Sequence, residues 1–220
     1  MGATKASATL RTGMAAGNAV ALLSVAYAMV LGIGLLTLPS PGMAIQDPWF
    51  TAMELLILVL APTMVALMAA IHAGAPAGRK SLALLGIVFM GMCTVITCSV
   101  HFAMLTLGRQ AAFATGDWAT LVFSFHWPSV AYALDILAWD VFFPLAALCA
   151  ACSVPGIGLA RLARRCFFAS AILAFAGLVG VPMANMSARN VGIIGYAVLF
   201  PIAAFLLALH LRRTARHGAI

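Results

Sequence analysis

The strongest constraint on this chain is an apolar run over residues 128–154 that carries two aspartates, Asp135 and Asp140. The run is long enough to cross a membrane as a helix. An aspartate at the centre of such a helix costs about 2.5–3.5 kcal/mol to insert, whereas each Leu, Ile or Phe returns only ~0.3–0.6 kcal/mol. This helix is therefore marginal alone and must face other helices. Its buried ionisable groups form a functional-site hypothesis.

The composition extends the same argument to the whole chain. Of 220 residues, 65% are apolar and 8% are charged, and the mean hydropathy is +1.11. A soluble domain of this length needs more polar surface than these residues provide. The sequence thus predicts an all-α polytopic membrane protein, with a bundle of six transmembrane helices in one domain over residues 1–220. The helices are expected at about 18–38, 48–72, 81–107, 128–153, 166–183 and 191–211.

Two segments outside these helices differ in character. Residues 1–14 are polar and small, and we expect them to be disordered. Residues 108–127 form the longest connection and contain several aromatic side chains with an occasional charge. That composition is typical of an interfacial segment that packs over the bundle.

The basic residues are distributed unevenly between the two predicted faces. Six helices place both termini on one side, and that side collects ten of the twelve Lys and Arg residues. The positive-inside rule then predicts cytoplasmic termini in the inner or plasma membrane. The net charge of +7 is interpreted as a topology signal and a contact with membrane lipid headgroups, and no nucleic acid is expected as a partner. The ten residues are Lys5, Arg11, Arg79, Lys80, Arg161, Arg164, Arg165, Arg212, Arg213 and Arg216, and the other two are Arg109 and Arg189.

With this orientation, the intramembrane acids concentrate in the outer half. Glu54 lies in the second turn of its helix, Asp135 lies two turns into the fourth helix, and Asp140 lies near mid-membrane. His101 lies near the outer end of the third helix. No Lys or Arg is expected within a spanning segment, so at least one carboxyl should keep its proton or face water. A neutral carboxylic acid is a good general acid, and a second carboxylate can act as the base.

Aromatic residues accompany the first aspartate on the fourth helix. Tyr132, Asp135, Trp139 and Phe143 fall at i, i+3, i+7 and i+11, which places an acid between aromatic faces on one stripe. Such faces stabilise cations, including developing carbocations. Trp127, just before the helix, is a further candidate for this pocket.

The second aspartate points elsewhere in a regular α-helix. Five residues turn the helix by about 500°, so Asp140 lies about 140° round from Asp135, and the two need not share one pocket wall. Pro144 removes the partner of the Asp140 carbonyl, and a kink is expected there.

Each of these features also has a structural interpretation. The carboxyls and His101 could bond to neighbouring polar side chains and fix helix packing, and an aromatic stripe also occurs as ordinary core. Cys149 and Cys152 form a CxxC spacing, which fits either a thiol redox pair or two small packing residues. The carboxyls with His101 could hold a hard divalent cation, but ligand-spaced histidines are lacking, so no metal and no cofactor is expected.

Residues 133–140, together with Glu54, resemble the small integral-membrane terpene cyclases of fungal meroterpenoid and bacterial drimentine-type pathways. They also resemble small helical membrane proteins of bacteria. The cyclases use a Glu and an Asp as acid and base on an epoxide or terminal alkene of a prenyl chain, without metal-diphosphate chemistry. The resemblance implies catalytic roles for Glu54, Asp135 and Asp140 without assigning acid and base. The fungal enzymes are usually given seven helices, whereas six are predicted here.

The leading hypothesis is accordingly a metal-independent cyclase of a prenyl or sesquiterpenoid chain. Asp135 or Asp140 would protonate the apolar prenylated substrate, and Glu54 would accept the final proton, or the roles would be exchanged. The pocket would be lined by Tyr132, Trp139, Trp127 and Phe143, with His101 orienting a carboxyl.

Two alternatives stay open on the sequence. One is a proton- or cation-coupled small-molecule transporter that uses the same carboxyls. The other is a non-catalytic protein that binds a lipid or another ligand. A blind apolar cavity would favour the enzyme, and a path to both faces would favour transport.

Overall fold

A computed structural model describes residues 2–40 and 43–217 of the chain, and every secondary-structure element in these ranges is helical. Six helical segments are long and apolar enough to cross a membrane, which confirms the predicted all-α architecture. They span Ala8–Leu36, Trp49–Gly74, Ala77–Arg109, Val130–Ser153, Leu159–Gly180 and Met186–Arg216.

The first three spans are single long helices, and the last three are composite. The first three are α1 (Gly2–Leu36), α2 (Trp49–Gly74) and α3 (Lys80–Thr106), with the short elements η1 (Ala77–Arg79), η2 (Leu107–Arg109) and η3 (Trp118–Val122) around α3. The fourth span comprises α4 (Val130–Ile136), η4 (Leu137–Phe142) and α5 (Phe143–Ser153). The fifth comprises α6 (Leu159–Gly177) and η5 (Leu178–Gly180). The sixth comprises α7 (Met186–Arg189), α8 (Val191–Ile193), η6 (Ile194–Leu199) and α9 (Phe200–His217).

Two predicted boundaries were wrong. Residues 2–14 belong to α1 and are helical, because alanine, the strongest helix former, recurs through this segment. The fifth span begins at Leu159, before residue 166, and its first turns contain Arg161, Arg164 and Arg165. Arginine is a good helix former, and its long side chain can reach polar surroundings from the end of a membrane helix.

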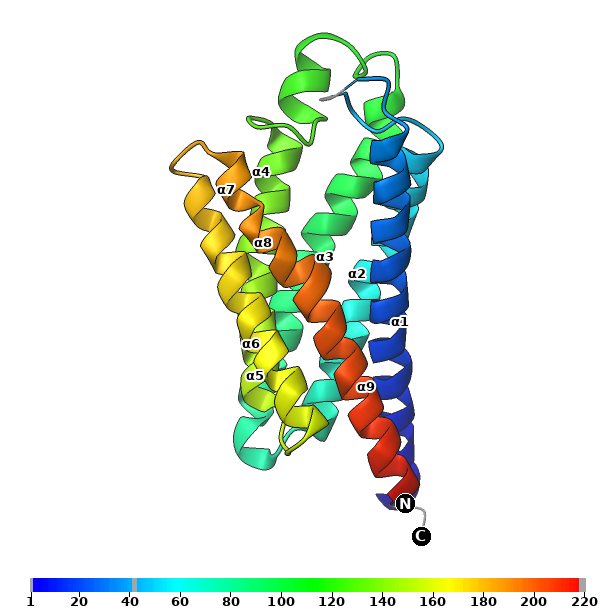
Figure 1. The fold of residues 1–220 in the computed structure, drawn as a ribbon, viewed down its shortest axis with the longest axis vertical. Helices are drawn as coiled ribbons and strands as arrows, with labels where there is room; N and C mark the ends of the chain where they lie inside the picture. The colour runs from blue at the N-terminus through cyan, green and yellow to red at the C-terminus, as the bar shows by residue number, and fades with distance from the viewer. Residues whose placement is uncertain (1, 41–42, 218–220) are drawn as a thin grey trace.

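Both termini lie at one end of the bundle, which we call the termini end (Figure 1). The turns between α2 and α3 and between α5 and α6 lie at the same end, and the connections at 37–40, 43–48 and 107–129 lie at the opposite end. Helix α1 packs along α2 and α9, while α5 packs between α3 and α6. The placement of the termini therefore agrees with the predicted topology, and their cytoplasmic orientation stays a prediction.

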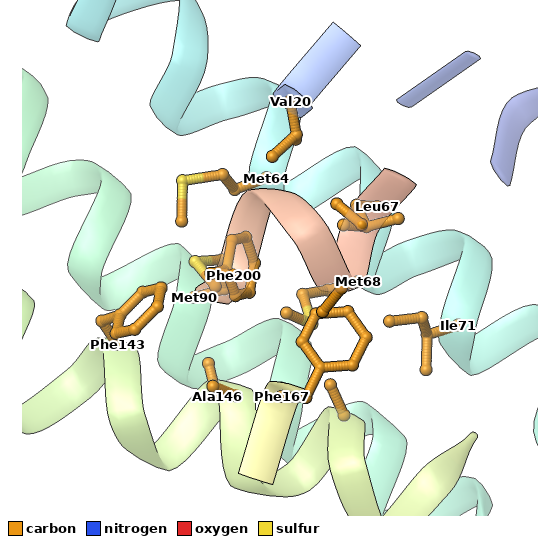
Figure 2. Close-up of a cluster of buried hydrophobic side chains, with 14 of the residues drawn as sticks. Val20, Met64, Leu67, Met68, Ile71, Met90, Phe143, Ala146, Phe167 and Phe200 are labelled. Carbon is orange, nitrogen blue, oxygen red and sulfur yellow. The ribbon is translucent and has the colours of Figure 1, made fainter. Parts of the chain in front are cut away.

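The half of the bundle nearer the termini end is a packed core (Figure 2). Phe143 is fully buried there, with its ring 5.0 Å from the ring of Phe200, which lies 5.3 Å from that of Phe167. Val20, Met64, Met68 and Met90 fill the space around these rings. This aromatic and thioether packing blocks the interior of the bundle between the six spans.

Two π-helical segments interrupt the spans above this core. In η4 the Phe143 N–H donates to the Ala138 carbonyl, and in η6 the Phe200 N–H donates to the Gly195 carbonyl, five residues back in each case. Both segments end just before a proline, Pro144 or Pro201. Because proline has no N–H and its ring crowds the preceding turn, the wider turn accommodates it. The expected kink at Pro144 is thus realised as a π-helical segment.

Small residues allow the helices to approach closely. A Cβ atom on Gly195 would lie 2.6 Å from the Ser170 carbonyl oxygen, and one on Gly17 would lie 2.6 Å from the Ala204 carbonyl oxygen. The buried Ser170 hydroxyl donates to the Gly195 carbonyl at 2.8 Å. Close backbone contact and hydrogen bonds of this kind drive helix association in lipid, where the hydrophobic effect does not.

The five cysteines are all free thiols. Cys149 is buried, with its Cβ close to Gly86 of α3, and Cys152 is exposed. The position of Cys149 fits the packing interpretation of the CxxC spacing.

We expect Gly195→Ala to destabilise the protein by about 1–3 kcal/mol, because the new methyl group overlaps a backbone carbonyl that cannot move alone. Gly91→Ala is the matched control, since a Cβ at that helical position meets nothing within 4 Å. The control should be neutral or gain up to ~1 kcal/mol of helix propensity. Unfolding of both variants in detergent micelles measures the difference, and equal stabilities would contradict the close α6–η6 contact.

Candidate functional site

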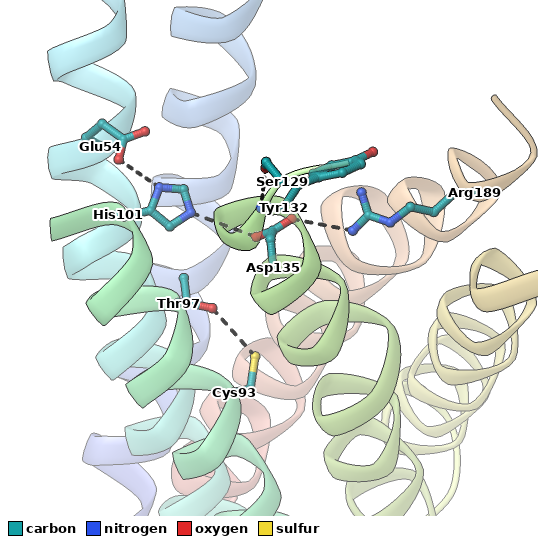
Figure 3. Close-up of polar contacts among 8 residues, drawn as sticks. All are labelled: Glu54, Cys93, Thr97, His101, Ser129, Tyr132, Asp135 and Arg189. Carbon is teal, nitrogen blue, oxygen red and sulfur yellow. Dashed lines mark hydrogen bonds and ion pairs between the residues drawn. The ribbon is translucent and has the colours of Figure 1, made fainter. Parts of the chain in front are cut away.

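Five ionisable side chains from four spans form a continuous row, which we call the charged network. Its members, in order, are Glu54 of α2, His101 of α3, Asp135 of α4, Arg189 of α7 and Asp140 of η4. Figure 3 shows the first four of them. The His101 Nδ1 atom lies 2.9 Å from Glu54 Oε2, and its Nε2 atom lies 4.0 Å from Asp135 Oδ1. The Arg189 Nη2 atom donates to Asp135 Oδ2 at 3.4 Å, and its Nε atom donates to Asp140 Oδ2 at 2.6 Å.

The charged network is almost completely removed from solvent. Glu54, Arg189 and Asp140 are 1%, 3% and 0% exposed, whereas the side chain of Asp135 keeps 16%. Three carboxyls face at most two positive charges, those of Arg189 and a protonated His101. Since unbalanced charge is costly in this surrounding, neutrality requires that at least one carboxyl keeps its proton. The network is therefore suited to holding and relaying protons.

The expectation that no arginine reaches the membrane interior was wrong. Arg189 was assigned to an outer turn, yet its side chain is buried and bridges two aspartates. Gly177 and Gly180 explain its position, because a Cβ on either would lie within 2.8 Å of the Arg189 backbone. The Asn185 side chain accepts from the Ala188 N–H and so caps α7. In the sequence, the pair Gly177 and Gly180 shortly before Asn185 and Arg189 was the pattern that could have predicted this close approach.

The sequence predicted only that Asp135 and Asp140 need not share one pocket wall, yet the same arginine contacts both. Asp135 and Asp140 both bind Arg189, because η4 is π-helical and its wider turn brings residues five apart onto one face. Gly192 leaves room for the Asp140 carboxyl, since a Cβ there would lie 3.0 Å from Oδ1. This Oδ1 atom has no hydrogen-bond partner among the described residues, so it can carry a proton without disturbing the bond to Arg189.

A cavity of about 680 Å³ adjoins the charged network in the half of the bundle away from the termini end. This volume is typical of small-molecule sites. Glu54, His101, Asp135 and Arg189 line it, whereas Asp140 is absent from its lining. The connections at the opposite end cover it with residues 43–45, 119 and 123–126, among them Phe123 and Phe125. Most other lining side chains are apolar or aromatic.

The predicted pocket residues separate into two groups. Tyr132, Trp139 and His101 line the cavity as expected. Phe143 lies in the core next to the cavity, because the π-helical turn of η4 rotates the predicted stripe of residues. Trp127 does not line the cavity; it is 39% exposed, and its ring lies 6.4 Å from the Tyr132 ring. Five cavity-lining aromatics were missed, namely Tyr27, Phe50, Phe123, Phe125 and Tyr196.

Local contacts hold the polar wall in place. The Ser129 side chain accepts from the Tyr132 N–H at 3.1 Å and caps α4, which sets the start of the helix that presents Asp135. The Tyr132 ring lies 4.8 Å from the Arg189 guanidinium carbon, a cation–π contact. His101 stacks on Phe125 at 5.1 Å between ring centroids. The network is thus positioned by packing as well as by charge.

The cavity is open at one side and blind below. Ala28 of α1 and Ile193 and Ala197 of the sixth span line it and are themselves exposed. Toward the termini end, Trp139 lines the cavity and packs on Phe143 at 5.6 Å, where the core begins. An apolar molecule could therefore enter sideways from lipid and would not pass through the bundle.

An ion pair between Asp47 and Arg109 joins two of the connections that cover the cavity. The Asp47 carboxylate accepts from the Thr51 hydroxyl at 2.5 Å and from the Thr51 N–H at 3.1 Å, and Arg109 donates to it at 2.9 Å. The Thr51 hydroxyl, its amide and the Arg109 guanidinium hold the pKa of Asp47 below its usual value. This pair ties the connection before α2 to the end of α3.

No protein-family model, curated protein or solved structure matches this chain. Within residues 2–40 and 43–217, no three His, Cys, Asp or Glu side chains converge as metal ligands. The resemblance to terpene cyclases stays a prediction, and the function has to be argued from the site itself.

We expect Arg189→Gln to destabilise the protein by about 3–5 kcal/mol, because it leaves two buried carboxyls without their cation. Arg109→Gln is the matched control, since it breaks a pair whose side chains are 38% and 54% exposed. The control should cost at most ~1 kcal/mol. Thermal unfolding in micelles compares them, and similar losses would show that Arg189 is not buried as described.

Proposed function

We propose that this chain is a membrane-embedded acid–base enzyme that cyclises an apolar prenyl or sesquiterpenoid chain. The observation that carries the proposal is the row Glu54–His101–Asp135, which faces an aromatic, apolar cavity that is blind toward the termini end. Acid and base groups in the wall of an apolar cavity suit a substrate that has few polar atoms. The cyclase resemblance stated for Glu54 and residues 133–140 points in the same direction.

Asp135 is the proposed acid because it is the most accessible carboxyl of the network. It would donate its proton to a terminal alkene or epoxide, and the double-bond electrons of the chain would then close rings onto the cationic carbon. Arg189 would stabilise the Asp135 carboxylate that remains. The faces of Tyr132 and Trp139 would stabilise the cation in the cavity.

Glu54 is the proposed base, which removes a proton from the final cation to form an alkene. His101 contacts Glu54 and lies 4.0 Å from Asp135, so it could return this proton to the acid once binding tightens the gap. The proton gained at the start equals the proton lost at the end. The reaction therefore balances as an isomerisation without a cofactor, and Asp140 acts only by positioning Arg189.

The two other candidates fit the site less well. A proton- or cation-coupled transporter needs a path to both faces, and the packed core at Phe143, Phe167 and Phe200 lies across that path. A protein that only binds a ligand would need the cavity, but the acid–imidazole–acid row would then serve only to hold α2, α3 and α4 together. We further infer that both termini face the cytoplasm of an inner or plasma membrane, because ten of twelve basic residues were assigned to the termini side.

We expect Glu54→Gln and Asp135→Asn each to lower turnover of prenylated substrates by about 10²–10⁴-fold, the usual contribution of a general acid or base. Purified protein would be incubated with linear sesquiterpenoid and longer prenyl alcohols and epoxides, and the products identified by mass spectrometry. Asp117→Asn, at an exposed position, is the matched control and should keep full turnover.

Two results would contradict this assignment. Full turnover by both variants would remove the acid–base roles. Tight binding of the prenyl compounds with no product from the wild-type protein would favour the ligand-binding alternative.

We expect Ala28→Trp and Ala197→Trp to lower turnover at least about tenfold by obstructing the side opening with a large ring. Val25→Trp and Val198→Trp are matched controls, because both positions are exposed on the same helices but do not line the cavity. Turnover measured in vesicles with the substrate dissolved in the bilayer tests this. Equal rates in all four variants would mean that substrate arrives by another route.

A further inference from the structure

A second recess, of about 630 Å³, lies at the termini end over α5, between the start of α3 and α6. We call it the basic groove. Its polar lining is Arg79, Arg164 and Arg165, and its apolar lining is Leu82, Ala151 and Phe168, with Cys152 between them. No part of the charged network contributes to it.

The lining of the basic groove contains no Asp or Glu side chain. The chain contains five Asp and Glu residues, and each lies in the opposite half of the bundle or in its connections. No ion pair joins Arg79, Arg164 or Arg165 to another described residue, whereas Arg109 and Arg189 are both paired. Three guanidinium groups around one recess can therefore bind an anion from outside the chain.

The apolar part of the basic groove indicates the kind of anion. Phe168 follows Arg164 by four residues and Arg165 by three, so its ring lies one turn further along the same face of α6 toward the membrane interior. Phe168 is 48% exposed, although it belongs to a span long and apolar enough to cross a membrane. Charge at the membrane edge followed by an exposed apolar wall matches a phosphate headgroup and the acyl chain attached to it.

We propose that the basic groove binds one anionic glycerophospholipid, with its phosphodiester on Arg79, Arg164 and Arg165 and an acyl chain against Leu82 and Phe168. The lipid bridges α3 and α6 across α5 and places its negative charge beside three arginines that form no ion pair with a described residue. The site is independent of the proposed chemistry, because it shares no residue with the cavity.

Cys152 reports on the occupancy of the basic groove in the unaltered protein, because it is exposed and lines the recess. The full chain would be reconstituted in phosphatidylcholine vesicles with or without phosphatidylglycerol. Its reaction with N-ethylmaleimide would then be followed by peptide mass spectrometry. We expect phosphatidylglycerol to slow the labelling of Cys152 several-fold while the labelling of Cys98 stays unchanged. Equal rates at Cys152 in both vesicles would overturn the proposal.

A charge-matched pair of variants separates a specific site from general attraction. In the groove variant, Arg79, Arg164 and Arg165 become Gln, and in the control variant Arg161, Arg212 and Arg216 become Gln. Both lose three positive charges, but the control residues do not line the recess. Native mass spectrometry in detergent should show at least about tenfold weaker phosphatidylglycerol binding for the groove variant only.

The remaining outcomes are equally decisive. Equal losses in both variants would show a diffuse surface effect and overturn the site. Displacement of the lipid by glycerol phosphate at equal concentration would show that the acyl chain contributes nothing, and would overturn the lipid as the ligand. If the groove variant does not fold, Phe168→Ala keeps all three charges and should still weaken phosphatidylglycerol binding while leaving glycerol phosphate unaffected.

Discussion

The half of the bundle away from the termini end depends on the ion pairs of the buried Arg189 guanidinium with Asp135 and Asp140. Removing an arginine from water is costly, and the cost is offset only where carboxylates and good hydrogen-bond geometry meet it. Here Asp135 and Asp140 provide both, at 3.4 Å and 2.6 Å. The fourth and sixth spans are thereby joined at a depth where lipid would otherwise separate them. Asp135 is held facing the cavity because its partner is anchored on a different helix.

The same region departs from regular α-helix in two places, and both departures serve the site. The π-helical turn of η4 aligns the two aspartates, and that of η6 places Tyr196 on the cavity. Each turn accommodates the proline just beyond it and lies next to the tightly packed core. Irregular backbone within a membrane is tolerated where it lines a cavity or is buried in protein. The half nearer the termini end is densely packed, and the half away from it holds the cavity.

The number of spans could be predicted, and Glu54, His101, Asp135 and Asp140 could be singled out as candidates, because both steps follow from local rules. Apolar length decides insertion, and ionisable side chains are rare in such lengths. The partnership with Arg189 could not be predicted in this way. It depends on Gly177 and Gly180 of the fifth span, which let the backbone of Arg189 approach. It also depends on the π-helical turn of η4, which rotates Asp140 toward the face that carries Asp135. Phe143 was wrongly predicted to line the pocket because of the same π-helical turn. Contacts between distant segments and the pitch of one turn are properties of the assembled bundle.

The most direct test of this account is the coupling free energy between Arg189 and Asp140 in a double-mutant cycle. Arg189→Gln, Asp140→Asn and the double variant would be unfolded in the same detergent and compared with the wild-type protein. The account predicts a coupling of about 1.5 kcal/mol or more, the lower bound for close buried charge pairs. Additive effects within ~0.5 kcal/mol, which is the behaviour of distant independent residues, would contradict the buried bridge and the site built on it.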